Sequence, residues 1–591
     1  MADMVKSKRS SALNVKRKNR AKVMKTVVQA VILLILGVIL FDAIFDVRRY
    51  EEPDRTQWSQ DKGFIALSYF GVGRTGTSKL VAKSQLDEQL GALYDQGYRT
   101  ISQQDIVDFY SAGKPLPEKA LFLSFEDGRN DSSLFAQPIL EKYNYKATFL
   151  SYANKMGNSE RKFLQPKDML KMEKTGFWEL GTNGYRLTYI NIFDDEGRYI
   201  GVRDEKDLTD KEHVEYYNHY LMDFVRDENM IPIENRSEME ERIHGDYEKM
   251  ESIYMKSLGY VPSVYMIMHA NALGQGMNRL VTDANTANIH KLFSMHFNRE
   301  GNVYNSAEHD LYDLTRVQPA SFWSTNHLLM KIHKDTGQAM EFVVGSRDAA
   351  EKWTAMSGAA EFKENQIIVT SPPAEAGRLY LDGSGELRDV RITAKLSGNV
   401  VGKQAVYARY NDTADVYVRV MLENNELHVD QKKAGQEPER IFTQELDPVL
   451  WSEEDLSFDK ASVYTKEQTA AGAVDDEEEY PVNIRHTRQI ELVLQGNTLK
   501  LNVDKKTLIE ELAIDSTVAS GGVALESQYN ERNEKDDIYD ALFEDLEIWT
   551  LEQANNEQDL VFSSVPTGMQ KVVGKMKKGI DIAVNWAIET F

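Results

Sequence analysis

The chain has 591 residues, so we expect two or more domains, because single hydrophobic cores stop growing well below this length. Its formal charge of −23 excludes non-specific nucleic-acid binding, since such binding needs a basic surface that displaces counterions. The sequence contains no cysteine, which excludes disulfides and thiolate metal sites, so any metal would need His, Asp or Glu ligands.

The N-terminus predicts a membrane anchor. Residues 1–25 form a tail dense in Lys and Arg, and an almost uninterrupted apolar run follows over 26–46. About 20 apolar residues can cross roughly 30 Å of hydrocarbon as a helix, and the preceding basic cluster predicts a cytoplasmic N-terminus. We therefore expect a single-pass protein of the cell membrane whose bulk lies outside the cell. A cleaved signal peptide is the alternative, although no small-x-small cleavage pattern follows the run.

Residues 62–338 alternate between short apolar runs and stretches with helical spacing. The helix expected over 78–98 is typical of the pattern, with Leu at helical intervals and a stop at a glycine. Helices between apolar strands imply βα units and a parallel sheet, which places functional groups at the carboxyl ends of its strands. The strands expected first are 63–72, 119–125 and 146–152.

Two adjacent carboxylates follow one of these strands. The stretch "LFLSFEDGRND" (121–131) runs from apolar residues into Glu126 and Asp127, then into a polar turn. Paired carboxylates at such a position are candidates for general acid–base work or metal ligation.

A polar stretch over 192–258 interrupts the alternation of strands and helices, and we predict a mainly helical insertion there with solvated charged faces.

Several of these segments together resemble a known family. "LPEKALFLSFEDGRND", the upstream "LDEQLGALYDQGYRTIS" and the downstream "DMLKMEKTGFWELGTNGYRL" resemble polysaccharide deacetylases of the NodB-homology type. The resemblance implies a distorted (β/α) barrel in which the first carboxylate is a general base. The second carboxylate and a His-x-x-x-His pair would bind a divalent metal that activates water.

Carried onto this chain, the resemblance gives an incomplete site. Glu126 takes the base position and Asp127 the metal-ligand position, but Asn183 and Leu187 stand at the two histidine positions. A catalytic zinc site normally has three protein ligands, so we expect no resident metal or other cofactor, with Asp127 the only retained ligand position. The residues expected to line the pocket are Asn183, Tyr185 and His269. The alternative ligands for rebuilding a metal site are His269, His296 and His333.

Three interpretations of the Glu126–Asp127 pair stay open. The pair could serve an active esterase or hydrolase by altered chemistry, or it could belong to a catalytically dead site that still binds sugar hydroxyls. It could also be structural, with Asp127 capping the following turn.

Residues 341–552 change to a period of two, with Asn-Asn and Gly-Asn turns between alternating strands, which predicts an all-β sandwich. In pattern the segment resembles the concanavalin- and laminin-G-like jelly rolls found beside glycan-active domains. Candidates for stacking on sugar rings are Tyr380, Tyr407, Tyr410 and Trp549, although core packing would also explain them. The tail over 566–591 predicts an amphipathic helix that lies on a membrane, on a partner or on its own domain.

The sequence therefore predicts a membrane-anchored extracellular protein that interacts with polysaccharide. The favoured role is a catalytically degenerate accessory factor in exopolysaccharide or cell-wall glycan synthesis or export, with a membrane synthase or export complex as an expected partner and no nucleic-acid partner. The alternatives are an active carbohydrate esterase or glycan hydrolase with a non-standard site, and a scaffold for a synthase complex.

Overall fold

The structure is a computed structural model. It describes residues 23–26, 29 and 48–566, except 78, 157–161, 209–213, 268–272, 274–276, 399–401, 424, 447–450, 454–478, 482–486, 531–536 and 552–557. The predicted anchor and the predicted C-terminal helix thus lie outside the described residues, apart from Thr26, Gln29 and Pro566. Among the helices that are described, none is both long and apolar enough to cross a membrane.

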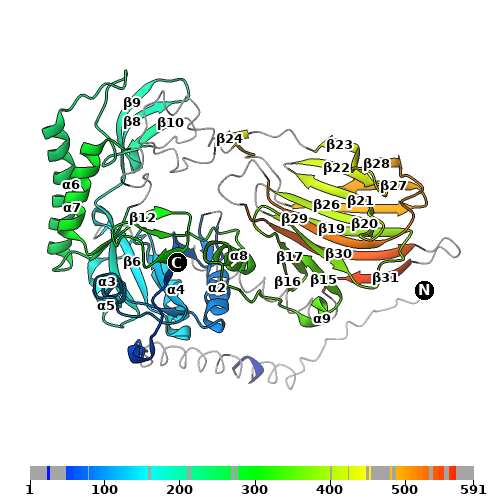
Figure 1. Cartoon of the computed structure of the whole chain (residues 1–591), viewed down its shortest axis with the longest axis horizontal. Coiled ribbons are helices and arrows are strands. Elements are labelled where there is room, and N and C mark those ends of the chain that lie inside the picture. Colours follow the sequence, from blue (N-terminus) through cyan, green and yellow to red (C-terminus); the bar gives the residue numbers. More distant parts are fainter. Residues whose placement is uncertain are drawn as a thin grey trace, which may run out of the picture.

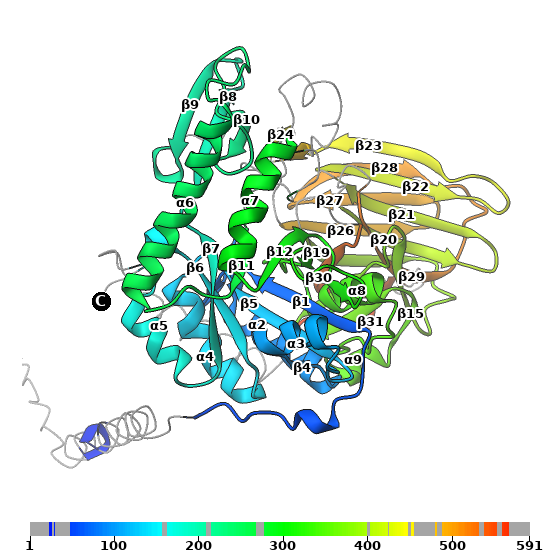
Figure 2. The same cartoon turned by 60° about the vertical axis from the view of Figure 1, so that its left-hand side comes forward.

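The first domain is an almost closed barrel of mainly parallel strands, in the order β13-β1-β5-β6-β7-β11-β12-β14 (Figure 2). Its strands are β1 (Gly63–Tyr69), β5 (Ala120–Phe125), β6 (Ala147–Tyr152), β7 (Trp178–Gly184), β11 (Val264–Met266), β12 (Met295–Glu300), β13 (Tyr304–Ser306) and β14 (Leu314–Arg316), with β4 (Arg99–Thr100) beside β5. The barrel closes where Val317, just after β14, pairs with Leu67 of β1 in parallel. The β1, β5 and β6 strands are buried throughout, because helices cover one face and the barrel interior the other.

The barrel helices begin and end where local sequence signals place them. Ser102 caps α3 through a capping box with Asp105, and Gly113 ends that helix in the left-handed region. The helices around the barrel are α2 (Lys83–Asp95), α3 (Gln103–Ala112), α4 (Asn130–Tyr143), α5 (Pro166–Glu173), α6 (Arg236–Ser257), α7 (Arg279–Leu292) and α8 (Thr325–Thr336). Shorter elements are η1 (Arg55–Gln57), β2 (Val72–Gly73), β3 (Val81–Ala82), η2 (Ala153–Lys155) and η3 (Glu205–Asp207).

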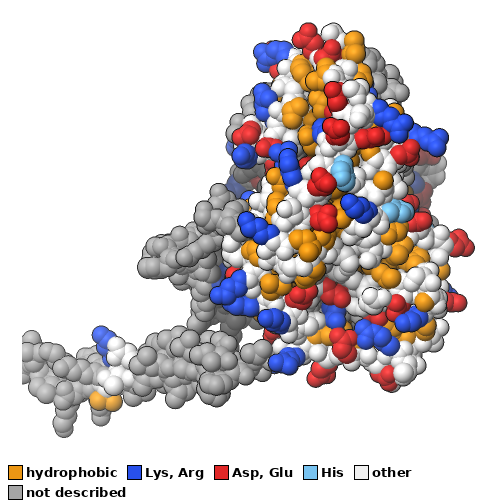
Figure 3. Space-filling view, turned by 90° about the vertical axis from the view of Figure 1, so that its left-hand side faces the viewer, with side chains coloured by type: hydrophobic (Ala, Val, Ile, Leu, Met, Phe, Trp, Pro, Cys, Tyr) orange, Lys and Arg blue, Asp and Glu red, His pale blue; other side chains and the backbone are white. Residues whose placement is uncertain are grey.

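The insertion predicted as mainly helical over 192–258 is helical only in its second part. Its first part belongs to a three-stranded antiparallel sheet of β8 (Thr188–Asp194), β9 (Tyr199–Asp204) and β10 (Val214–His219), which lies beside α6 (Figure 2). The helical prediction was wrong there because "TYINIFD" is rich in β-branched and aromatic side chains, and every residue of β8 is buried. The face of the molecule seen in Figure 3 carries interspersed acidic and basic side chains, as a solvated surface does.

The second domain is a sandwich of two antiparallel sheets (Figure 1). The seven-stranded sheet has the order β15-β18-β29-β20-β21-β22-β23, and the other has β16-β17-β30-β19-β26-β27-β28, with β31 beside β30. The strands are β15 (Trp353–Ser357), β16 (Ala359–Lys363), β17 (Gln366–Thr370), β18 (Ala376–Leu381), β19 (Val390–Gly398), β20 (Lys403–Asn411), β21 (Val416–Glu423), β22 (Glu426–Lys432), β23 (Glu439–Glu445), β26 (Thr487–Gln495), β27 (Thr498–Val503), β28 (Lys506–Ala513), β29 (Gly522–Gln528), β30 (Asp540–Leu551) and β31 (Gln558–Ser563). A separate strand pair joins β24 (Trp451–Glu453) and β25 (Glu479–Pro481).

The sandwich therefore extends past the predicted end at residue 552, because β31 pairs with β30. Alternate residues of β26 and β27 face the core, which is the period-two pattern that the sequence showed. A short helix, α9 (Arg347–Ala350), precedes the first strand.

The two domains touch through α8 and the edge of the sandwich beside β16 and β17 (Figure 1). Ser324, the N-cap of α8, donates its backbone N–H to Asp540 Oδ2 at 2.8 Å, and His327 Nδ1 lies 3.1 Å from the same oxygen. Lys334 pairs with Asp537 at 2.7 Å across the same boundary. These polar contacts fix the barrel against the sandwich.

Candidate functional site

The two candidate carboxylates lie directly after β5, at the carboxyl end of the barrel. Glu126 is fully buried, and its carboxylate accepts hydrogen bonds from Gln318 Nε2 at 2.7 Å and from Arg316 Nε at 3.5 Å. Arg316 ends β14 and is itself buried, with Glu300 Oε2 at 3.1 Å from its Nη2. The end of β14 and the residues after it thus hold Glu126 in place.

Burial controls the protonation of Glu126. Loss of solvent raises the pKa of this carboxyl to about 7, against the opposing attraction of Arg316, and the nearby Glu300 raises it further. A carboxyl with a pKa near neutrality suits a general base, but this one has no exposed surface from which to reach a substrate. Catalysis by Glu126 would therefore require the site to open.

Asp127 occupies a different environment, although it is the next residue. Its φ of 65° and that of Gly128 at 69° form a tight left-handed turn, which Asp tolerates better than most residues. Lys155 Nζ donates to Asp127 Oδ1 at 2.5 Å, and Arg129 Nη1 lies 3.9 Å from the other carboxylate oxygen. Lys155 belongs to η2, directly after β6, so the cation comes from the neighbouring strand end.

The two positions that carry histidine in the family hold Asn183 and Leu187, which form structural contacts. Asn183, near the end of β7, accepts the backbone N–H of Asp127 at 3.2 Å and donates to Met266 O at 3.0 Å. Leu187 is buried in an apolar cluster with Tyr152 and Tyr189. Its side chain has no lone pair, and the Asn183 amide is already hydrogen-bonded on both sides.

These residues do not fit a divalent metal. An ammonium already contacts the one retained ligand, Asp127, and two of the three expected ligand positions offer no imidazole. In the part of the chain that the structure describes, no group of three His, Asp or Glu side chains could hold a metal ion. Lys155 thus places a fixed positive charge against the Asp127 carboxylate.

The histidines considered as alternative ligands do not rebuild the site. His296 is buried in β12 and stacks on Tyr265 at 4.9 Å, and burial lowers its pKa to about 3. His333 Nδ1 lies 2.7 Å from Gln338 O at the end of α8. His269 lies outside the described residues. Tyr185 is half-buried, and the guanidinium of Arg186 lies 5.1 Å from its ring centroid.

Two buried donors beside Asp127 are left unused. Neither the hydroxyl of Tyr152 nor Nε of Arg129 forms a hydrogen bond within the described part of the chain. Tyr152 is 2% exposed, and the ammonium of Lys155 lies 4.6 Å from its ring centroid. Because buried donors are normally paired, this site has spare capacity for acceptor oxygens of a ligand.

Sequence reasoning missed three members of the site, namely Lys155, Arg316 and Gln318. Each follows or ends a barrel strand at the same edge as Glu126, so strand-end position was the available signal. Lys155 comes three residues after β6. Arg316 is the charged residue of β14, a short strand that is buried throughout.

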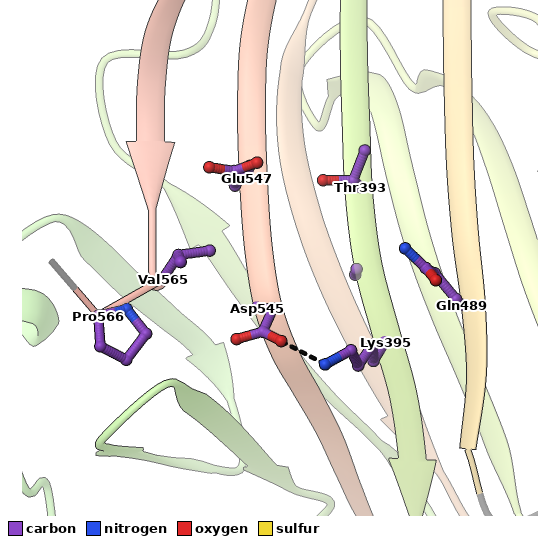
Figure 4. Close-up of a pocket in the computed structure, with 8 residues that line it drawn as sticks. Thr393, Lys395, Gln489, Asp545, Glu547, Val565 and Pro566 are labelled. Atoms are coloured by element: carbon purple, nitrogen blue, oxygen red, sulfur yellow. Dashed lines mark hydrogen bonds and ion pairs between the residues drawn. The ribbon is translucent and has the colours of Figure 1, made fainter. Parts of the chain in front are cut away.

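A more open depression lies elsewhere, on the sandwich (Figure 4). Thr393 and Lys395 of β19, with Gln489 of β26, line it together with residues of β30, and Lys395 Nζ donates to Asp545 at 2.5 Å. Lys395 and Asp545 pair with each other, and the depression lies on a different domain from the barrel carboxylates. We attach no chemistry to this depression.

The geometry can now be compared with known proteins. Residues 113–261 match the sequence model of the polysaccharide deacetylase family, and this range contains both carboxylates and both replaced histidine positions. The chain contains a polysaccharide deacetylase domain. The sandwich is consistent with a jelly roll, and nothing identifies its family more closely.

Among curated proteins, the chain is similar to poly-beta-1,6-N-acetyl-D-glucosamine N-deacetylases. It is 25% identical to the Escherichia coli enzyme over 226 residues, which are 37% of this chain and 32% of the relative. It is 24% identical to a Staphylococcus aureus enzyme over 176 residues, 26% of this chain and 60% of the relative. The match thus spans about a third of the E. coli relative.

Solved structures resemble the chain only weakly over its full length. A de-N-acetylase from Aggregatibacter actinomycetemcomitans has a TM-score of 0.35 at 19% identity, covering 45% of this chain and 98% of the other. The carbohydrate binding module CBM66 from Bacillus subtilis has a TM-score of 0.23 at 13% identity, covering 33% and 94%.

Proposed function

We propose that this protein is an accessory factor in exopolysaccharide synthesis or export, whose deacetylase-type barrel binds the glycan without metal-dependent deacetylation. The names of the curated relatives support the exopolysaccharide context, since they act on a polymer of N-acetylglucosamine. The apolar run over 26–46 supports anchoring at the membrane with the barrel outside the cell. A membrane synthase or export complex is the partner that such a position suggests.

The observation that carries the proposal is the Lys155–Asp127 ion pair. A metal and an ammonium cannot both take the same carboxylate oxygen, and the side chains at 183 and 187 supply no imidazole. Without a metal, no Lewis acid polarises the acetyl carbonyl in the way the family requires. What remains is the barrel rim, by which we mean the polar side chains around Glu126 and Asp127 at the carboxyl end of the barrel. Unused donors of Tyr152 and Arg129 at this rim suit the binding of glycan oxygens.

The test measures binding and turnover separately on the intact chain. A β-1,6-linked N-acetylglucosamine oligomer is titrated by calorimetry, and acetate release from the same oligomer is assayed with added zinc. We expect binding without acetate release, and weaker binding after Asp127→Asn. The matched control Glu240→Gln, on the exposed side of α6, should bind as the wild type does.

One observation favours a second function, an esterase with a non-standard site. The pKa of Glu126 near 7 suits a general base, and Lys155 could stabilise developing negative charge in place of a metal. Acetate release that is insensitive to chelators and lost in Glu126→Gln would establish this function and overturn the binding-only proposal.

A further inference from the structure

The outer face of the seven-stranded sheet carries an unusual set of side chains. Outer faces of sheets usually alternate small polar and charged residues in contact with water, but this one is built from arginines, tyrosines and buried carboxylates. We call it the Arg–Tyr face, and its central residues are Arg378, Tyr407, Tyr417, Arg419, Asp430 and Glu526.

Strand register places these residues in cross-strand contact. Arg378 of β18 pairs with Glu526 of β29, and on the neighbouring strands Arg419 pairs with both Tyr407 and Asp430. The residues that alternate with them belong to the hydrophobic core, for example Leu379, Leu525 and Val418. The Arg–Tyr face therefore points away from the core of the sandwich.

A chain of ion pairs crosses this face. Arg378 Nε donates to Glu526 Oε2 at 3.1 Å, and Tyr407 Oη donates to the same oxygen at 2.8 Å. Arg419 Nη2 donates to Asp430 Oδ2 at 2.6 Å, and its Nη1 lies 3.4 Å from Glu526 Oε1. The network is thus continuous over β18, β29, β21 and β22.

Stability does not explain this network. Glu526 is 3% exposed and Asp430 is 2% exposed, and desolvating such charges costs about as much as their pairing returns. Apolar or β-branched side chains would cover the same sheet at lower cost. A network of this kind on an outer face is better explained by recognition, because it holds planar groups in fixed orientations.

The guanidinium groups are positioned by aromatic rings. The guanidinium carbon of Arg378 lies 5.3 Å from the ring centroid of Tyr407, and that of Arg419 lies 5.7 Å from it. The side chain of Arg378 is 29% exposed and that of Arg419 is 18% exposed. Three of the five N–H donors of Arg378 are used within the described residues, by Glu526 and Tyr410, so donors remain for a ligand.

We infer that the Arg–Tyr face is a binding site for a neutral saccharide, separate from the barrel site. Tyrosine rings offer surfaces for the C–H face of a sugar, and the half-buried Tyr417 and Tyr380 flank the ion pairs. The partly exposed guanidinium groups of Arg378 and Arg419 donate to vicinal hydroxyls, and the buried carboxylates of Glu526 and Asp430 hold them in place.

Charge identifies the occupant as neutral. The face carries three cations, Arg378, Arg419 and Arg440, and three anions, Glu526, Asp430 and Asp412. Asp412 is counted because it accepts a hydrogen bond from Tyr410 at 3.0 Å. The face therefore has no excess charge for an acidic polymer, and the chain as a whole carries −23. A polyol without charge is the ligand that best matches charge-balanced guanidinium donors beside tyrosine rings.

The test is binding of the intact chain to an array of neutral and acidic glycans, followed by affinity electrophoresis with the best neutral probe. We expect Tyr417→Ala and Tyr417→Leu each to weaken retention at least about tenfold, since stacking residues carry much of such affinity. The matched control Tyr94→Ala removes an exposed aromatic residue near the C-terminal end of α2 in the barrel domain and should leave retention unchanged.

Two further measurements distinguish binding at this site from binding at the barrel. Asp127→Asn should leave retention by the Arg–Tyr face intact, so failure of the barrel proposal and failure of this one give different results. Retention should persist between about 0.05 M and 0.5 M NaCl, because a neutral ligand is not screened. The inference is overturned by binding only to acidic glycans, by no binding to any neutral glycan, or by Tyr417 variants that retain glycan fully while folded.

Discussion

The barrel rim and the Arg–Tyr face hold carboxylates in opposite ways. On the Arg–Tyr face, Asp430 is flanked by two arginines, and their hydrogen bonds bring the pKa of its carboxyl below the ordinary value despite burial. At the rim, burial dominates at Glu126, whose pKa is raised, and donors such as Tyr152 are unused. The charged groups of the Arg–Tyr face are thus paired with one another, whereas buried donors at the rim have no partner among the described residues.

The two regions should therefore respond differently to substitution. In the barrel, β5 leads into Glu126 and Asp127, Asn183 and Leu187 stand at the two histidine positions of the family motif, and Lys155 contacts Asp127. Histidines introduced at positions 183 and 187 should therefore raise the metal affinity of the barrel strongly. On the Arg–Tyr face, removal of any one member of the network should lower the stability of the fold.

The largest effect is expected from rebuilding the metal site. Asn183→His and Leu187→His, combined with Lys155→Ala, should increase zinc affinity by roughly 1,000-fold over the wild type, about 4 kcal/mol. Calorimetry with zinc measures the change. Adding Asp127→Asn to the triple variant should abolish the gain, and a triple variant that binds zinc no better than the wild type would show that the strand ends do not have metal-site geometry.

The next effect concerns the pH dependence of folding. Because the pKa of Glu126 is about 7 in the folded chain and about 4.5 when unfolded, the folded state holds its proton more tightly between these values. Stability is therefore highest below pH 4.5 as far as this group is concerned, and it falls by about 3 kcal/mol as pH rises to 7.

Glu126→Gln should remove this loss of unfolding free energy. The urea midpoint of the variant should therefore rise relative to that of the wild type as pH increases from 5 to 8. Glu240→Gln, an exposed match, should follow the wild-type profile. Parallel profiles for Glu126→Gln and the wild type would mean that Glu126 is ionised throughout this range.

On the Arg–Tyr face, Arg419→Ala removes the guanidinium that joins Asp430 to Glu526. We expect a loss of about 2 kcal/mol in the free energy of unfolding, less than for a pair left wholly without partners, because Arg440 and Arg378 remain. Lys500→Ala, which breaks the exposed Lys500–Glu510 pair, should cost less than about 0.5 kcal/mol. Equal effects in the two variants would contradict the continuous network.

The smallest effect distinguishes a binding role from a structural one at the rim. Tyr152→Phe removes a buried hydroxyl that has no partner among the described residues, so stability should stay level or rise by about 1 kcal/mol. Binding of the β-1,6-linked oligomer should nevertheless weaken several-fold. Unchanged binding would show that this hydroxyl does not contact the glycan, and Tyr189→Phe in the same cluster serves as the control.

Much of the barrel could be predicted from the sequence because its strands are short apolar runs with both faces buried. The strands expected over 119–125 and 146–152 correspond to β5 and β6. The sheet of β8 to β10 was missed because its strands lie within a polar stretch that also suits a helix. The β-branched and aromatic side chains of β8 were a local signal for it.

The site was predicted only as far as local sequence reaches. Glu126, Asp127 and Asn183 do come together, since Asn183 accepts the backbone N–H of Asp127. Lys155 and Arg316 could not be found from spacing, because their roles arise where strands distant in sequence end side by side. The contact of Lys155 with Asp127 is a tertiary property that local sequence does not reveal.

The central claim is that the barrel holds an ammonium where its family holds a metal, and zinc binding to the intact wild-type chain tests it most directly. Calorimetry together with elemental analysis after dialysis should show a dissociation constant weaker than about 100 μM and far less than one zinc per chain. One tightly bound zinc per chain, lost in Asp127→Asn, would contradict the account.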